Sequence, residues 1–208
     1  MYRIGTVTFY REELRDLAIA WLALGVAFAF LLEPASIQQM LAGAGTFGRT
    51  FLLSMLTVGV GFLLHELAHK VVAVRFGQIA AFKADYGMLA LAIASGLAGF
   101  FFAAPGAVYH RGRITLRQNG LVSVAGPVTN LVLAAVFVLP FLLFGGFVGQ
   151  IAQMGVLVNL FLAAFNMLPF GPLDGKTVRA WDTGVFALVF SVAVVSLLGF
   201  VLFFGIGL

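Results

Sequence analysis

Charged residues are so sparse along this chain that they divide it into long apolar runs with short polar breaks between them. A helix that crosses a bilayer needs about 20 mostly apolar residues. Runs of about this length predict five transmembrane helices: Leu17–Leu32, Thr50–Phe76, Leu121–Phe144, Gly149–Leu168 and Thr183–Leu208. The fold class predicted from this pattern is an all-α polytopic membrane protein.

The first run follows a short polar arm, Met1–Asp16, and ends at Glu33-Pro34, a typical helix stop. Its basic flank and short length also suit a signal peptide. No small-x-small cleavage site follows it, so we interpret it as the first transmembrane helix. A Gly-rich loop, Ala35–Arg49, is expected to connect it to the second helix.

The segment Tyr86–Tyr109 is ambiguous, because its 24 uncharged residues are enough for a span by length alone. Glycines interrupt it at Gly96 and Gly99, and Pro105-Gly106 ends it. We therefore predict that the region from about 79 to 117 is a re-entrant or β-hairpin segment associated with the membrane.

Composition agrees with a membrane setting and excludes several kinds of site. Hydrophobic residues make up 62% of the 208 residues and charged residues only 10%, against about 25% charged in soluble domains. There is no cysteine, so a disulfide framework and a thiolate metal site are excluded. The 12 Lys and Arg residues form no basic stripe interleaved with exposed aromatics, so no nucleic-acid partner is expected.

Candidate chemistry lies in the second apolar run, at His65-Glu66-Leu67-Ala68-His69. Histidines at positions i and i+4 share one helix face, so both imidazoles can reach a single ion. Glu66 lies beside them and can act as general base towards a metal-bound water. The alternative is a pair of core histidines with a stray carboxylate. The cost of ionisable groups at membrane depth makes a functional role the better interpretation.

A catalytic zinc site needs a third protein ligand and leaves the fourth position to water. Five acidic or histidine residues in or near apolar sequence are candidates: Glu33, Asp85, His110, Asp174 and Asp182. Asp174 stands out because Pro169 and Pro172 break the preceding helix, and such a break can turn a carboxylate back towards the bundle. An Asp in an ordinary turn at the helix end is an equally good explanation of the same residues.

Two motifs in this order resemble the site-2 protease family of intramembrane zinc metalloproteases. These are His65-Glu66-x-x-His69 in one apolar helix and, after another, Asn166-x-x-Pro169 leading into Leu173-Asp174-Gly175. Ala125-Gly126-Pro127-x-x-Asn130 also resembles the opening of that family's middle core helix. The resemblance covers roughly Phe51–Arg179. Where many members have a second glycine after the last motif, this chain has Lys176.

The resemblance implies a role for each matching residue. His65, His69 and Asp174 are expected to hold one zinc ion per chain, Glu66 is the expected catalytic residue, and Asn166 and Asn130 are expected to contact substrate. The implied activity is hydrolysis of peptide bonds within or near transmembrane segments. We predict one membrane-embedded protease domain over residues 1–208, with its core at 51–179, an N-terminal arm and helix at 1–50 and a C-terminal helix at 180–208.

The number of membrane crossings between the two histidines and Asp174, odd or even, tests this ligand set. If Tyr86–Tyr109 crossed the membrane, three crossings would separate the histidines from Asp174, which would then emerge on the opposite face. If the segment turns back, two crossings separate them and the ligands meet. The turn also gathers nearly all basic residues on one side, the cytoplasmic side by the positive-inside rule, and leaves Arg49 alone outside. That side then holds Arg3, Arg11, Arg15, Lys70, Arg75, Lys83, Arg111, Arg113, Arg117, Lys176 and Arg179.

The expected setting is therefore the cell membrane, with a multi-pass chain whose N-terminus and active-site opening are cytoplasmic. The expected partners are the lipid bilayer and a transmembrane protein or peptide substrate. Two alternatives remain. A metal transporter should carry further intramembrane ligands, which the uncharged run Gln118–Leu173 lacks, and a non-catalytic membrane scaffold would not require Glu66 beside paired histidines.

Overall fold

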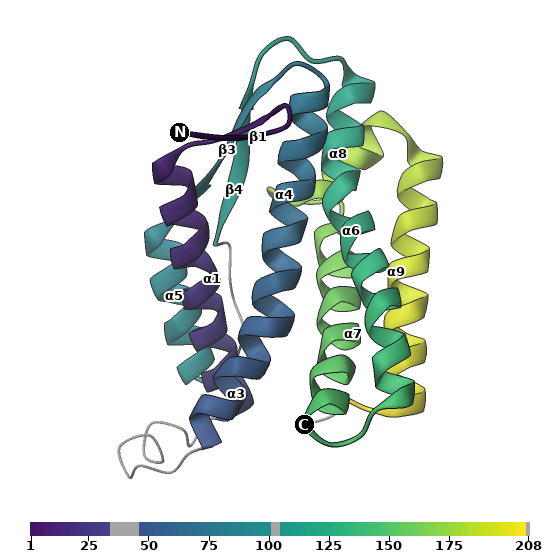
Figure 1. Ribbon diagram of the computed structural model, residues 1–208. Helices are drawn as coiled ribbons and strands as arrows, with labels where there is room; N and C mark the ends of the chain where they lie inside the picture. The colour runs from purple at the N-terminus through teal and green to yellow at the C-terminus, as the bar shows by residue number, and fades with distance from the viewer. Residues whose placement is uncertain (34–45, 101–104, 207–208) are drawn as a thin grey trace.

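The computed structural model describes residues 1–33, 46–100 and 105–206 (Figure 1). Most of the predicted loop Ala35–Arg49 lies outside these residues. Five helices in the described part are long and apolar enough to cross a membrane by length and composition, which confirms the predicted all-α polytopic class. They are α1 (Arg11–Leu32), a long helix over 46–75, α6 (Leu116–Leu143), α7 (Gly146–Asn166) and α9 (Thr183–Phe204).

The long helix is central in the bundle and consists of three parts: α3 (Thr46–Ser54), a π-helical turn η1 (Met55–Gly59) and α4 (Val60–Arg75). In Figure 1, α6, α7 and α9 stand on one side of α4, and α1 and α5 (Tyr86–Leu97) stand on the other. Helix α6 packs against both α4 and α7, and α9 packs against α7. The candidate chemistry on α4 is therefore enclosed between two groups of helices.

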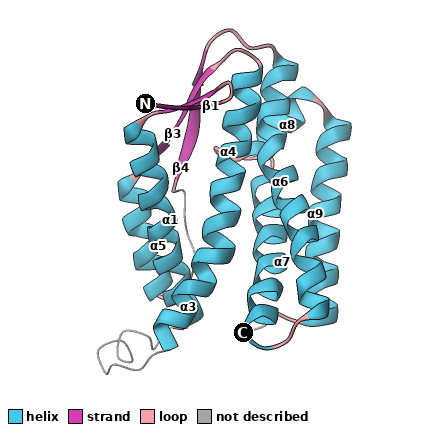
Figure 2. Ribbon diagram, viewed as in Figure 1, coloured by secondary structure: helices cyan, strands magenta, loops and turns pink. Residues whose placement is uncertain are grey.

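The ambiguous segment turns back, as predicted. Strands β3 (Ile79–Ala84) and β4 (Gly106–Arg111) pair antiparallel, with Phe82 opposite Val108 (Figure 2). Between them α5 has 12 residues, or about 18 Å at 1.5 Å per residue, which is too short for a hydrocarbon core of about 30 Å. The segment is thus a β-hairpin whose connection contains a short apolar helix.

The N-terminal region differs from the polar arm expected over residues 1–16. Strands β1 (Tyr2–Ile4) and β2 (Val7–Phe9) form a small hairpin, and α1 already begins at Arg11. The reason is that two carboxylates in its first turns are buried rather than solvated. Glu13 accepts a hydrogen bond from the Phe82 amide at 3.1 Å, and Asp16 accepts one from the Ala84 amide at 3.1 Å. Two charges within the expected polar arm therefore dock α1 onto β3.

Helix α1 also contacts the π-helical turn. A π turn leaves backbone groups outside the regular helical ladder, and the Trp21 indole N–H donates to the Met55 carbonyl at 3.0 Å. Gly59 lies so close to the Trp21 ring that a β-carbon there would overlap it. This contact holds the helix in place just before it presents the histidines.

Candidate metal centre

Three of the buried polar side chains of α4 belong to the candidate site: His65, Glu66 and His69, with 4%, 7% and 8% of their surface exposed. The two imidazole rings lie face to edge with centroids 4.6 Å apart. The spacing of i and i+4 has the geometric effect predicted from the sequence, because both rings leave the helix on the same side.

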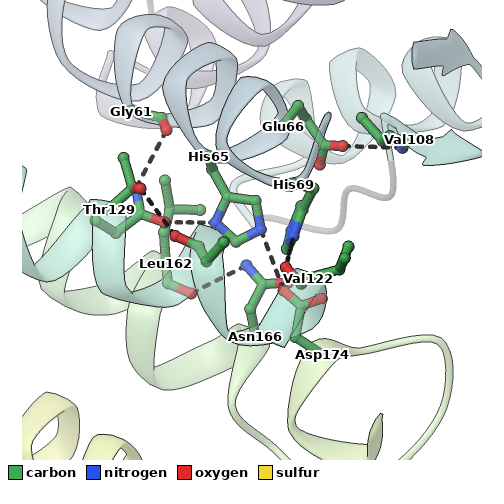
Figure 3. A network of polar contacts seen from close by, with 12 residues as sticks. Gly61, His65, Glu66, His69, Val108, Val122, Thr129, Leu162, Asn166 and Asp174 are labelled. Atoms are coloured by element: carbon green, nitrogen blue, oxygen red, sulfur yellow. Dashed lines mark hydrogen bonds and ion pairs between the residues drawn. The ribbon is translucent and has the colours of Figure 1, made fainter. Parts of the chain in front are cut away.

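Asp174 reaches these histidines from the other end of the site. It is the first residue of α8 (Asp174–Trp181), a short helix that the sequence analysis did not predict. Its Oδ2 lies 3.2 Å from His65 Nε2 and 3.3 Å from His69 Nε2 (Figure 3). Burial opposes ionisation of this carboxyl, but the neighbouring His69 and His65 lower its pKa to about 2. Asp174 is therefore negatively charged, as a metal ligand must be.

These three residues form the one group in the described part of the chain that could hold a metal ion. Bonds of about 2.0–2.2 Å to a tetrahedral zinc place ligand atoms roughly 3.3–3.5 Å apart, close to the observed separations. Gly126 of α6 leaves room at this point, because a β-carbon there would lie 2.5 Å from both Nε2 atoms. Two imidazole nitrogens and one carboxylate oxygen are a donor set typical of catalytic zinc. The residues present therefore fit zinc.

The far nitrogens of both imidazoles have acceptors that orient the rings. His69 Nδ1 lies 2.7 Å from the Val122 carbonyl, and His65 Nδ1 lies 2.6 Å from Asn130 Oδ1. A carbonyl oxygen can only accept a hydrogen bond, so Nδ1 carries the proton in each ring. In the neutral ring Nε2 then carries the lone pair, the form needed for metal binding.

Glu66 lies on the side of α4 that faces the β-hairpin. Its Oε2 accepts a hydrogen bond from the Val108 amide of β4 at 3.1 Å (Figure 3). Strand β4 is paired on its other side with β3. The candidate base is therefore held by the edge of the hairpin that β3 leaves unpaired, a contact that no sequence pattern indicated.

The two predicted substrate-contacting residues occupy different surroundings. Asn166 ends α7, is half-buried and donates to the Leu162 carbonyl of its own helix at 3.0 Å (Figure 3). Asn130 is wholly buried and bonded to His65. A substrate-contacting role stays a prediction for both.

The other candidates for the third ligand lie away from this group. Asp85 and Asp182 cap the N-termini of α5 and α9, where they accept from Met88 and Val185. Glu33 follows the end of α1, and His110 is part of β4. The sequence left two interpretations of Asp174 open: a carboxylate turned back towards the bundle, or an Asp in an ordinary turn. Its contacts with His65 and His69 agree with the first.

One buried polar residue beside the centre was not among the predicted site residues. Asn159 of α7 has no exposed surface and accepts a hydrogen bond from Asn130 Nδ2 at 2.8 Å. The sequence feature that could have identified Asn159 is an amide side chain within the uncharged run Gln118–Leu173. Polar residues in transmembrane helices usually face the interior and have partners.

Comparison with known proteins gives one informative relative. The chain is 38% identical over 185 residues to the "Putative zinc metalloprotease MJ0611" of Methanocaldococcus jannaschii, covering 87% of this chain and 90% of the relative. No family model and no solved structure matches the chain.

Proposed function

Because the chain belongs to the zinc metalloprotease family of its archaeal relative, we propose that it is an intramembrane protease of the site-2 type. Its substrates are membrane proteins cleaved within or near their transmembrane segments. The observation that carries the proposal is the position of the centre. His65, His69 and Asp174 converge beside Glu66. The helix that carries both histidines and Glu66 is long and apolar enough to span a bilayer.

In this proposal His65, His69 and Asp174 hold the zinc, and Glu66 is the catalytic base. Zinc supplies Lewis-acid activation of water and polarisation of the scissile carbonyl when it is bound. Glu66 accepts the proton of the attacking water at a carboxylate oxygen and delivers it to the amine that leaves. Burial of Glu66 and the two histidines keeps bulk water from screening these charges.

Substrate entry requires local unwinding, because a helical peptide bond in lipid is shielded by its own hydrogen bonds. We propose that the free edge of β4 receives the unwound segment as an added strand, a common way to bind extended peptides. The support is the Val108 amide, which points from that edge to Glu66. Asn166, at the end of α7, is the side chain that we propose contacts the substrate near the reacting carbonyl.

The proposed orientation places the N-terminus and the opening of the site in the cytoplasm. Its support is the pairing of β3 with β4, which returns the chain after α5 to the level from which it left. Basic residues before and after this hairpin then lie on one side of the membrane, as the positive-inside rule requires.

The test compares wild-type protein with Glu66→Gln on a model transmembrane substrate in proteoliposomes. The amide is nearly isosteric but cannot accept the proton, so cleavage should fall by about 10²–10⁴-fold, while zinc content stays the same. Asp182→Asn is the matched control, because it makes the same carboxylate-to-amide change at the cap of α9, outside the ligand group, and it should cleave at close to the wild-type rate. Cleavage by Glu66→Gln at the wild-type rate would refute the mechanism.

The same experiment discriminates against the other function classes. A metal transporter needs a series of ligand sites along a path, whereas the part of the chain that the structure describes holds one such group. Zinc uptake into sealed vesicles, unchanged by Glu66→Gln and without substrate cleavage, would favour the transporter. Neither uptake nor cleavage would favour the scaffold.

A further inference from the structure

Behind His65, away from Asp174, a chain of buried amide groups connects three helices. Asn130 of α6 and Asn159 of α7 have no exposed surface. Asn130 Oδ1 lies 2.6 Å from His65 Nδ1, and Asn130 Nδ2 donates to Asn159 Oδ1 at 2.8 Å and to the Gly61 carbonyl at 3.1 Å. Asn159 Nδ2 donates to the Gly155 carbonyl at 2.8 Å. The chain thus runs from a proposed zinc ligand to the backbone of α7.

Two backbone carbonyls determine the direction of every hydrogen bond in this chain. Gly155 can only accept, so Asn159 turns its NH₂ to Gly155 and its oxygen to Asn130. That oxygen and the Gly61 carbonyl both require donors, so Asn130 directs its NH₂ to them and its oxygen to His65. An oxygen there requires a proton on Nδ1, so in the neutral ring the Nε2 lone pair is available to bind metal.

The three helices approach closely at this chain. A β-carbon on Gly61 would lie 2.8 Å from Asn159 Oδ1, so the glycine allows α4 and α7 to come close enough for the amides to connect them. Buried amides are costly unless every donor and acceptor is paired. Here both amide nitrogens and both oxygens have partners.

We propose that Asn159 is a positioning residue that keeps His65 in its metal-binding tautomer through Asn130. The inference rests on the proposed zinc site. Without the Asn159 oxygen, the Gly61 carbonyl is the one remaining acceptor for the Asn130 NH₂, so rotation of the Asn130 amide breaks one hydrogen bond instead of two. Its NH₂ would then face His65 Nδ1 and require a lone pair there. The proton would move to Nε2, where it blocks coordination of zinc.

The experiment measures zinc affinity and the His65 tautomer in full-length protein, and neither readout involves peptide cleavage. Zinc is removed with a chelator and returned in competition titrations. Nitrogen-15 NMR of histidine-labelled apoprotein reports which ring nitrogen carries the proton, and the chain has only three histidines. Failure of this inference is thereby distinguishable from failure of the proposed proteolysis.

Asn159→Leu removes the acceptor and keeps the branching of the side chain at Cγ. We expect zinc affinity to fall by about 10-fold, as for other outer partners of metal-binding histidines, with His65 shifting towards the Nε2–H form. Thr129→Val is the matched control, because Thr129 neighbours Asn130 on α6 but bonds only to the Ala125 carbonyl of its own helix. It should leave both readouts unchanged.

Asn159→Thr is the second variant and guards against a folding defect in Asn159→Leu. A threonine hydroxyl can bond to the carbonyl four residues earlier, here Gly155, but cannot at the same time reach Asn130. It should therefore reproduce the weaker zinc binding and the tautomer shift. Wild-type zinc affinity and an Nδ1–H His65 in either folded variant would overturn the proposal.

Discussion

Helix α4 borders two buried polar networks that differ in charge. One is the amide chain from His65 through Asn130 to Asn159. The other begins at the residue after His69, where Lys70 Nζ lies 2.5 Å from both carboxylate oxygens of Glu13. The side chain of Lys70 is 0% exposed and that of Glu13 is 1% exposed.

The ionic network docks segments together. Glu13 also accepts from the Phe82 amide of β3 at 3.1 Å and from the Tyr10 amide at 3.2 Å, and Lys70 Nζ lies 4.1 Å from the centroid of the Phe9 ring. One carboxylate thus connects the N-terminal hairpin, α1, β3 and α4. A buried ion pair of this kind requires extra hydrogen bonds to offset its desolvation.

The comparison shows how a membrane-embedded site can keep structural and chemical tasks separate. The neutral amides orient the proton on His65 without adding a charge beside the proposed zinc ligands. The charged pair, which would disturb a metal directly, faces the other segments and holds them to α4. Removing a member of the amide chain should therefore weaken zinc binding, whereas removing Lys70 should weaken folding.

Loss of a proposed ligand should have the largest effect. Asp174→Ala leaves two imidazoles and no carboxylate, so zinc should fall from about one per chain to a small fraction, a greater loss than for Asn159→Leu. Metal analysis of purified protein checks this. Asp182→Ala removes a carboxylate that caps α9 outside the ligand group and should keep its zinc. Full zinc retention in Asp174→Ala would remove Asp174 from the site.

Lys70→Met should have the next largest effect, on stability rather than on zinc. It leaves the Glu13 carboxylate buried without its cation, which costs about 3–5 kcal/mol of unfolding free energy. Adding Glu13→Gln should recover most of this, because the amide is neutral and its oxygen can still accept from Phe82. Denaturant unfolding in detergent measures both. If Lys70→Met were as stable as wild type yet lost its zinc, the separation of the two tasks would be wrong.

Cysteine substitutions at exposed positions should have the smallest effect on the protein and sharpen its topology. The chain has no cysteine of its own, and Lys83, Arg113 and Arg49 are exposed. In oriented vesicles an impermeant reagent should label Lys83→Cys and Arg113→Cys from the cytoplasmic side, and Arg49→Cys from the other side. Opposite labelling of Lys83→Cys and Arg113→Cys would contradict the returning hairpin.

The sequence by itself determined the features that depend on local spacing. Lengths of apolar runs predicted the five long helices, because a bilayer requires spans of similar length. The i, i+4 spacing of His65 and His69 placed both rings on one face, because helix geometry is regular. The need to bring Asp174 to the same level predicted that the segment after Asp85 turns back.

Tertiary structure alone decided which polar groups meet. Asp174 and Asp182 both precede or begin helices in similar polar sequence, yet only Asp174 reaches the histidines. Glu13 looks like part of a solvated arm until β3 and Lys70 surround it. Asn159 is one amide in an apolar run until α6 brings Asn130 to it. The physical reason is that a hydrogen bond depends on the position of two partners in space, and these partners are far apart in the chain.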